Sequence, residues 1–238
     1  MATSLARFWY ASVRLGPPQV TAETNVADQV ELDLIPMSDF KPLNLDDART
    51  REMPKKIQYA CGLNPFEGWL NVDFFDDAVM WNFSHIGGVP RNVAENVYKV
   101  NLLERHPFPD NAFEYAFCED FVEHLEQKDA ITFLSEVFRT LKPGGVVRIA
   151  TPGFEQVMRN HFLNATFDKI ADGHRGAYTQ WGHLHFFTHD SLEVMARWLG
   201  FSKYRIKKIH KSWHRPLRNL EIRVGQAQYM NIYAELTK

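Results

Sequence analysis

Small residues and a carboxylate follow two successive apolar runs near the middle of the chain. The first run, Lys56–Ala60, is predicted to be a strand and leads directly into Cys61 and Gly62. A turn of small residues at the carboxyl end of a strand lets the backbone approach a ligand closely. The next predicted strand, Trp69–Phe74, contains Asp73, whose carboxylate can accept hydrogen bonds from both hydroxyls of a ribose. The pattern indicates a nucleoside site, although a turn of this kind is equally compatible with a structural role.

A second group of residues has the donor atoms of a metal site. Asp120, Glu123 and His124 are spaced i, i+3 and i+4, which would place them on one face of a helix. Carboxylate oxygens and an imidazole nitrogen suit magnesium, manganese or a similar divalent ion. We expect His183 or His185 as a further ligand if a metal binds. The alternative is that the Glu-His pair is structural and holds no metal.

Histidines are also the side chains best suited to remove a proton from a hydroxyl near neutral pH. His124 is the first candidate for such a base and His183 the second, and the alternative for His124 is a structural role beside the neighbouring helix. His183 belongs to the histidine-rich stretch 182–190, which would suit contacts with an aromatic or sugar-like substrate. A well-packed surface loop would have the same composition.

The elements that must position these residues alternate between strands and helices from about Lys55 onward, which is typical of parallel βαβ units. We expect an α/β fold with a seven-stranded, mostly parallel sheet, an antiparallel edge strand and helices on both faces. The last two strands should form an antiparallel pair, because the loop Arg215–Gln226 between them has no helical pattern. The predicted strands are Lys56–Ala60, Trp69–Phe74, Asn96–Leu102, Phe113–Cys118, Val146–Thr151, Lys203–His210 and Tyr229–Leu236.

Two helices are clearly predicted. Apolar residues recur at intervals of three and four from Ala130 to Leu141, so they share one buried face. The sequence Lys142–Gly145 ends this helix, because a proline and two glycines favour a turn. A second helix spans Ser191–Leu199. Residues 1–54 do not fit the alternation and are expected to be an N-terminal extension that packs on the core domain, residues 55–238; the alternative is a lid over the site.

Composition narrows the functional classes. The chain has 238 residues, with 27 basic and 29 acidic side chains, and its charges are interspersed along the sequence. It therefore lacks the broad basic field that nonspecific nucleic-acid binding uses, and a nucleic-acid partner is disfavoured. Its two cysteines, Cys61 and Cys118, are expected to be reduced thiols. With neither a leader nor a membrane-spanning stretch in the sequence, we expect a cytoplasmic protein without a membrane partner. The oligomeric state is left open.

Several ordered segments together resemble a known family. These segments are Asn101-Leu102, Pro107–Tyr115, Glu123–Leu125 and Arg139–Gly145. In order and spacing they resemble the class I methyltransferases that depend on S-adenosylmethionine, in particular the ubiquinone and menaquinone biosynthesis enzymes and many glycan methyltransferases. The resemblance covers roughly residues 57–201 and implies a Rossmann-like fold with S-adenosylmethionine as the cofactor.

The resemblance also implies a role for each cofactor-binding residue. Ala60, Cys61 and Gly62 would hold the methionine part of the cofactor, and Asp73 would hold the ribose. Asn101 would meet the adenine amino group, and Leu102 would pack against the base. Glu119 and Asp120 would line the cofactor near its sulfonium.

Two positions depart from the family pattern, because Ala60 stands where a glycine is usual and Asn101 where an aspartate is usual. Either change would weaken cofactor binding. The spacing Asp120-x-x-Glu123-His124 resembles the pattern of metal-dependent 2′-hydroxyl methyltransferases of small RNAs and of some ubiquinone-pathway enzymes.

The expected function is methyl transfer to a small molecule or a glycan, at oxygen because histidines crowd the acceptor side. The alternative is a noncatalytic member of the same fold that binds the cofactor or a protein partner, as Ala60 and Asn101 would allow. A nicotinamide-dependent oxidoreductase fits poorly, because the residues Leu63–Phe66 lack the glycines of a dinucleotide-binding turn.

Overall fold

The computed structural model describes residues 33–46, 53–75, 77–160, 162, 164–180, 182–222 and 228–238. Most of the predicted N-terminal extension, residues 1–54, therefore lies outside the described residues, and its packing stays a prediction. Its described part contains β1 (Leu34–Ile35), which pairs antiparallel with β4 (Val89–Pro90). None of the helices in the described ranges is both long and apolar enough to cross a membrane.

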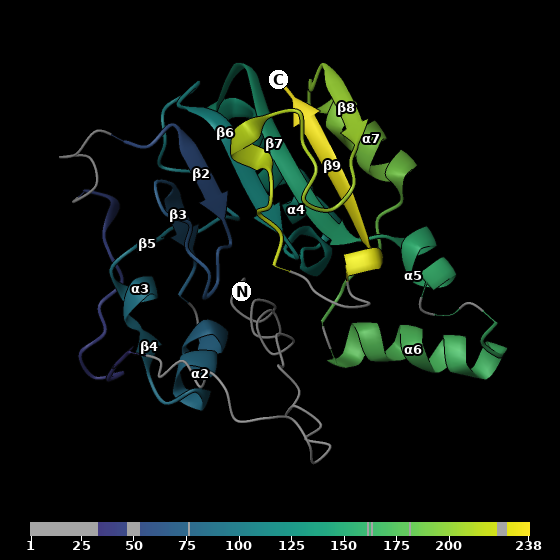
Figure 1. Cartoon of the computed structure of the whole chain (residues 1–238), viewed down its shortest axis with the longest axis horizontal. Coiled ribbons are helices and arrows are strands. Elements are labelled where there is room, and N and C mark those ends of the chain that lie inside the picture. Colours follow the sequence, from purple (N-terminus) through teal and green to yellow (C-terminus); the bar gives the residue numbers. More distant parts are fainter. Residues whose placement is uncertain are drawn as a thin grey trace.

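The described residues form a main sheet of seven strands in the order β5-β3-β2-β6-β7-β9-β8 (Figure 1). Neighbours from β5 to β7 run parallel, whereas β9 runs antiparallel to both β7 and β8. The predicted α/β sheet and its antiparallel pair at one edge are confirmed, with β9 on the inner side of the pair. The strands are β2 (Lys56–Tyr59), β3 (Leu70–Asp73), β5 (Val97–Lys99), β6 (Phe113–Glu119), β7 (Leu141–Pro152), β8 (Lys203–Ile206) and β9 (Asn231–Thr237).

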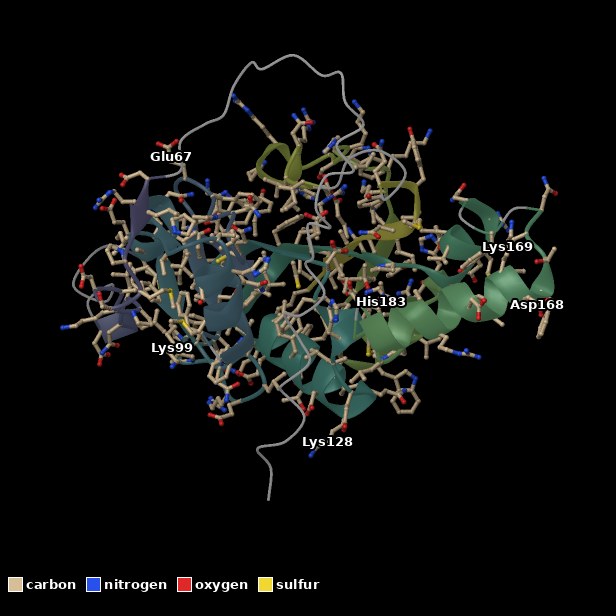
Figure 2. All side chains as sticks on the ribbon, turned by 90° about the horizontal axis from the view of Figure 1, so that it is seen from below. Glu67, Lys99, Lys128, Asp168, Lys169 and His183 are labelled. Atoms are coloured by element: carbon tan, nitrogen blue, oxygen red, sulfur yellow. The ribbon has the colours of Figure 1, made fainter. Side chains whose placement is uncertain are left out.

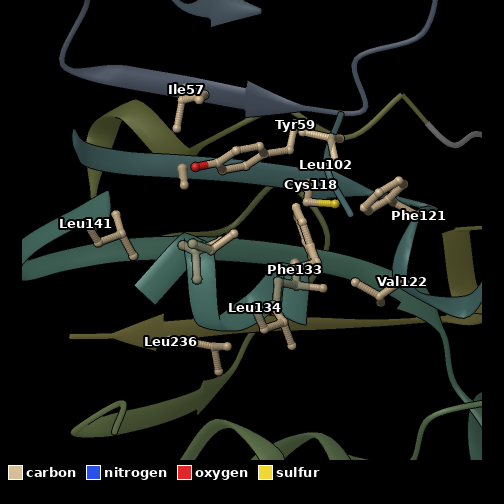
Figure 3. Close-up of a cluster of buried hydrophobic side chains, with 14 of the residues drawn as sticks. Ile57, Tyr59, Leu102, Cys118, Phe121, Val122, Phe133, Leu134, Leu141 and Leu236 are labelled. Carbon is tan, nitrogen blue, oxygen red and sulfur yellow. The ribbon is translucent and has the colours of Figure 1, made fainter. Parts of the chain in front are cut away.

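One face of the sheet is covered by α4 (Gln127–Thr140) and α7 (His189–Trp198). The predicted apolar stripe of α4 is confirmed, because Ala130, Phe133, Leu134 and Val137 are completely buried. The exposed side of this helix includes Lys128, which lies at the periphery of the molecule (Figure 2). Figure 3 shows the buried side chains of α4 meeting those of the strands. Removal of this apolar surface from water holds the helix to the sheet.

The opposite face is covered by shorter elements. The 3-10 helix η3 (Arg215–Leu217) places Leu217 in a buried cluster with Trp69, Phe117 and Val146. Nearer the other edge, α3 (Arg91–Ala94) and α2 (Asp77–His85) bury apolar side chains in a cluster that includes Val97. The prediction of helices on both faces is therefore confirmed.

The connection between β2 and β3 contains no helix, which departs from the alternation expected from the sequence. Two buried amides organise this connection instead. Gln58 Oε1 and Asn71 Oδ1 both accept from the backbone N–H of Phe66, at 3.1 and 2.9 Å. Gln58 Nε2 donates to the carbonyl of Asn64 at 3.0 Å, and Asn71 Nδ2 donates to that of Phe66 at 3.1 Å. These side chains satisfy backbone groups that a helix would otherwise satisfy internally.

Other boundaries differ locally from prediction. The strand expected over Lys203–His210 ends at Ile206, and His210 lies in the left-handed region with φ +60°, which an extended strand cannot contain. Helices α5 (Phe154–Asn160) and α6 (Phe167–Gln180) were not predicted. Figure 1 shows α5 just past the carboxyl end of β7, with α6 below it. The second predicted helix is confirmed as α7, which begins after a capping box at Thr188.

Candidate functional site

The carboxyl ends of four neighbouring strands, β5, β3, β2 and β6, bring most of the predicted cofactor residues to one edge of the sheet. Past the end of β2, the N–H of Cys61 donates to the carbonyl of Val72 at 3.3 Å. Past the end of β5, the N–H of Val100 donates to the carbonyl of Asp73 at 2.8 Å. Parallel strands present such ends side by side, and open α/β sheets bind ligands there.

Asp73 holds the turn after β2 by its own side chain. Its Oδ2 accepts from the N–H of Gly62 at 2.7 Å, and its Oδ1 accepts from the N–H of Phe74 at 2.7 Å. The residue is only 2% exposed, so both bonds form away from bulk water. Charge-assisted bonds of this length are stronger than neutral ones. Asp73 therefore fixes the backbone of the turn that is expected to face the cofactor.

The first residue of that turn, Ala60, lies in the left-handed region with φ +48°. This conformation costs an L-residue about 1 kcal/mol and costs glycine almost nothing. The structure thus gives a physical reason for the glycine that is usual at this position. Gly62, with φ +53°, occupies the same region at no such cost.

The neighbouring residues differ in how far they are buried. Cys61 packs in the cluster of α2 and α3, and burial raises the pKa of its thiol well above the usual value, so the thiol is neutral. Leu102 is buried in the main core, in the same cluster as Tyr59 (Figure 3). Asn101 is half-buried, and its Oδ1 accepts from the N–H of Leu103 at 3.1 Å. A carbonyl oxygen has a second lone pair, so this bond leaves Asn101 able to accept another.

The end of β6 is tied to the C-terminal part of the chain. Glu119 Oε2 accepts from the N–H of Ile222 at 3.1 Å. Asp120, in the left-handed region with φ +49°, accepts at Oδ1 from Asn231 Nδ2 at 2.9 Å. Asn231 is the first residue of β9 and is 7% exposed. These two bonds set the orientation of the carboxylates that are expected near the sulfonium.

The predicted helical face of Asp120, Glu123 and His124 is wrong. Residues Val122–His124 form the 3-10 helix η2, and α4 begins only at Gln127. Because Asp120 precedes this turn in a left-handed conformation, α-helical spacing does not apply to it. Asp120 binds Asn231 and does not belong to the cluster of potential metal ligands that the structure brings together.

That cluster consists of Glu123, His124 and His183, each of which offers one ligand atom within 4.8 Å of the others. The backbone carbonyl of Glu123 accepts from the N–H of Leu184 at 2.8 Å, which fixes the histidine-rich segment beside η2. The imidazoles of His124 and His183 meet edge to face with centroids 4.9 Å apart. His183 is buried, and it lies near the middle of the view in Figure 2. Two segments far apart in sequence thus build one polar site.

The tautomer of His124 follows from its neighbours. Its Nδ1 lies 3.3 Å from the carbonyl oxygen of Gly182, which can only accept, so Nδ1 carries the proton in the neutral ring. Its Nε2 is then the proton acceptor and lies 3.8 Å from Glu123 Oε1. The other oxygen of Glu123 accepts from Thr151 Oγ1 at 2.9 Å. With the proton on Nδ1 and the carboxylate of Glu123 beside Nε2, the imidazole of His124 is arranged to take up a proton at Nε2.

The ring contact of His185 differs from those of His183. Its ring packs edge-on against Phe187 with centroids 4.3 Å apart, and burial lowers its pKa. It does not join the ligand cluster.

Two residues that sequence reasoning missed are Thr151 and Asn231. Thr151 could have been predicted, because it is a polar residue at the carboxyl end of a buried strand. The contact of Asn231 with Asp120 could not, because no pattern in the sequence around Asn231 indicates it.

Comparison with solved structures finds methyltransferases at low sequence identity. A methyltransferase dependent on S-adenosylmethionine from Archaeoglobus fulgidus is 14% identical, with 82% of this chain and 91% of that chain covered and a TM-score of 0.47. One from Methanosarcina mazei is 15% identical, with 83% and 97% covered and a TM-score of 0.45. Phosphoethanolamine N-methyltransferase 2 of Haemonchus contortus, in complex with S-adenosylmethionine, is 18% identical, with 72% and 36% covered and a TM-score of 0.45.

No curated protein sequence matches the chain. Residues 79–149, from α2 to the middle of β7, match the family model described as a methyltransferase domain. This segment contains β6, η2 and α4, which are the elements that hold Glu119, Glu123 and His124. The likeness to the methyltransferase domain thus covers these residues, a little under a third of the chain.

Proposed function

We propose that the protein transfers the methyl group of S-adenosylmethionine to a hydroxyl of a small molecule or glycan, with His124 as the proton acceptor. The observation that carries this proposal is the geometry of His124, whose Nδ1 is directed to the carbonyl of Gly182 so that Nε2 bears the lone pair. A methyl transfer to oxygen needs alignment of donor and acceptor and removal of the hydroxyl proton.

Glu123 and His183 would assist His124 in this role. The carboxylate of Glu123 lies close enough to stabilise the imidazolium that forms when Nε2 takes up the proton. Thr151 holds the other oxygen of that carboxylate and so fixes its direction. The rings of His183 and His124 pack edge to face, which would restrict the rotation of His124. His183 would serve as a second proton acceptor if the substrate lies on its side.

The cofactor would lie at the neighbouring strand ends. In this proposal the turn Ala60–Gly62 holds the methionine part, and Asp73, which fixes that turn, holds the ribose. Asn101 would accept from the adenine amino group, Leu102 would support the base from the core, and Glu119 and Asp120 would face the sulfonium.

A divalent metal is a second use of the same polar cluster. One carboxylate oxygen and two imidazole nitrogens within 4.8 Å of one another fit the donor preference of such an ion. Glu123, His124 and His183 would hold it, and the bound ion would act as a Lewis acid toward the acceptor hydroxyl. The Nε2 of His124 can serve either as a ligand or as a base, so the two uses exclude each other at that atom.

The test begins with calorimetric binding of S-adenosylhomocysteine, followed by methyl transfer to a panel of hydroxyl acceptors. In His124→Asn, the amide nitrogen can still donate to the carbonyl of Gly182 while the basic Nε2 is lost. We expect this variant to bind S-adenosylhomocysteine as the wild type does and to lose at least about 100-fold in kcat. Wild-type activity that survives a chelator supports the base, and activity that requires added Mg²⁺ or Mn²⁺ supports the metal.

The same experiment separates the noncatalytic alternative. Binding of S-adenosylhomocysteine without transfer to any acceptor of the panel would favour a protein that binds the cofactor without turnover. An unchanged kcat in His124→Asn would instead remove His124 from the mechanism and direct attention to His183→Asn.

A further inference from the structure

The nearly neutral charge of the chain conceals a strong local imbalance. Residues 203–218 contain seven lysines and arginines and no carboxylate. The rest of the chain holds 20 basic and 29 acidic side chains, so its net charge is −9 against +7 for this segment. The expectation that charges are interspersed along the chain therefore fails here.

The carboxylates beneath this segment do not neutralise its surface. Glu221 and Glu235 are buried and both pair with the fully buried guanidinium of Arg148, Glu235 at 3.2 Å. Glu235 also pairs with Lys207 at 3.4 Å. These two anions and two cations form a neutral buried group.

The other cations of the segment form no ion pair with a described carboxylate. They are Lys203, Arg205, Lys208, Lys211, Arg215 and Arg218, and all six residues are exposed. Because the buried group beneath them carries no net charge, these six cations give the surface a net positive charge.

The fold places these cations on one side of the molecule. Arg205 lies on the edge strand β8, opposite Glu235 in the register, and so points to the face that carries Arg148. The chain then folds back over this face, where the carbonyls of Lys208 and Lys211 accept from Arg148 at 2.9 and 3.0 Å. These inward carbonyls anchor the segment to the sheet. Edge strand and returning segment thus form one surface, the basic surface of residues 203–218.

An exposed tryptophan joins the two parts of the basic surface. The ring of Trp213 lies 4.5 Å from the guanidinium of Arg205 and 3.9 Å from Nζ of Lys207, measured to the ring centroid. Such cation–π contacts order long side chains that would otherwise be mobile. The ring itself stays 70% exposed, and it is the one exposed aromatic side chain among residues 203–218, whereas proteins that bind single-stranded nucleic acids stack successive bases on several rings.

We propose that the basic surface binds an anionic polysaccharide, and that the acceptor of the methyl transfer is therefore an acidic glycan. This inference rests on the proposed function. The surface supplies several uncompensated cations to a chain of carboxylates or sulfates, and its single exposed aromatic ring cannot stack successive bases. It also leads toward the site, because Ile222, just after it, donates to Glu119 at the end of β6.

The test measures the affinity of the full-length protein for a heparin oligosaccharide at increasing salt, using the variant Lys208→Gln/Lys211→Gln/Arg215→Gln. The control is Lys41→Gln/Lys128→Gln/Lys169→Gln, in which three exposed cations outside the surface are removed for the same change in net charge. Figure 2 shows Lys128 and Lys169 at the periphery. We expect at least about a tenfold loss of affinity at 0.15 M salt in the first variant, from three exposed charge contacts, and no such loss in the control.

Equal affinities of the two variants would overturn the proposal. A single-stranded oligonucleotide of equal charge that binds more tightly than the oligosaccharide would also overturn it, in favour of a nucleic acid. Binding of S-adenosylhomocysteine, measured on the same samples, tests the proposed function separately, because none of the substituted residues lies at the cofactor edge. A variant that keeps this binding but loses the oligosaccharide supports the proposal.

Discussion

Replacement of Asp73 by asparagine should destabilise the protein through the turn after β2. The carboxylate accepts two backbone bonds of 2.7 Å, from Gly62 and from Phe74, and is almost fully buried. Asparagine keeps one acceptor oxygen and turns an N–H₂ group toward the other backbone N–H. The loss of one charged hydrogen bond and the burial of an unsatisfied donor together amount to about 3 kcal/mol.

For a domain of this size, a loss of that magnitude lowers Tm by about 6 to 12 °C. Urea unfolding followed by circular dichroism gives the free energy of unfolding directly. Glu67→Gln is the matched control, because it makes the same carboxylate-to-amide change on the exposed part of the β2–β3 connection (Figure 2). We expect the control to remain within about 0.5 kcal/mol of the wild type.

The second readout is the affinity for S-adenosylhomocysteine. If Asp73 both builds the turn and binds the ribose, affinity falls together with stability. A stable Asp73→Asn variant, within about 0.5 kcal/mol of the wild type, would refute the reasoning that its carboxylate holds the turn. Reduced stability with unchanged affinity would confirm the structural role and refute the ribose contact.

Three further changes test separate parts of the fold. His106 is buried, and its pKa is lowered to about 4, chiefly by desolvation, so the unfolded chain binds a proton at this residue more readily than the folded chain. The free energy of unfolding should therefore fall by up to about 3 kcal/mol as the pH drops from 6.5 to 4. The variant His106→Phe should flatten this dependence, measured by urea unfolding at each pH. Ala60→Gly should raise the free energy of unfolding by about 1 kcal/mol, since it relieves the left-handed conformation, and a lower urea midpoint would contradict that account. Arg148→Met should cost about 3 to 5 kcal/mol, because Glu221 and Glu235 lose their buried partner, and an unchanged Tm would show that the buried group contributes nothing.

The sheet could be predicted from the sequence because each central strand is a short apolar run bounded by turn residues. The stripe of α4 was equally clear, since Phe133, Leu134 and Val137 recur at helical spacing and are buried. The β2–β3 connection was not predictable, because its structure depends on two buried amides, Gln58 and Asn71, whose partners are backbone groups that no periodicity reveals.

The site was predictable only where it follows the strands. Asp73 and the turn after β2 could be located because they sit at strand ends, which the sheet brings together. The contact of Glu123 and His124 with His183 joins segments separated by three helices, α4, α5 and α6, so only the structure shows it. Asp120 was wrongly placed because α-helical spacing was assumed where the chain makes a 3-10 turn.

The position of β9 has a consequence for the order in which the chain folds. Among the described strands, β8 pairs with β9 alone, and β9 in turn fills the place between β7 and β8. During synthesis β8 is made before β9, so it has no strand to join until β9 emerges from the ribosome. The edge of β7 stays unpaired during that interval and is open to association with other chains. Assembly of this half of the sheet thus depends on a pairing that must wait until β9 has been made.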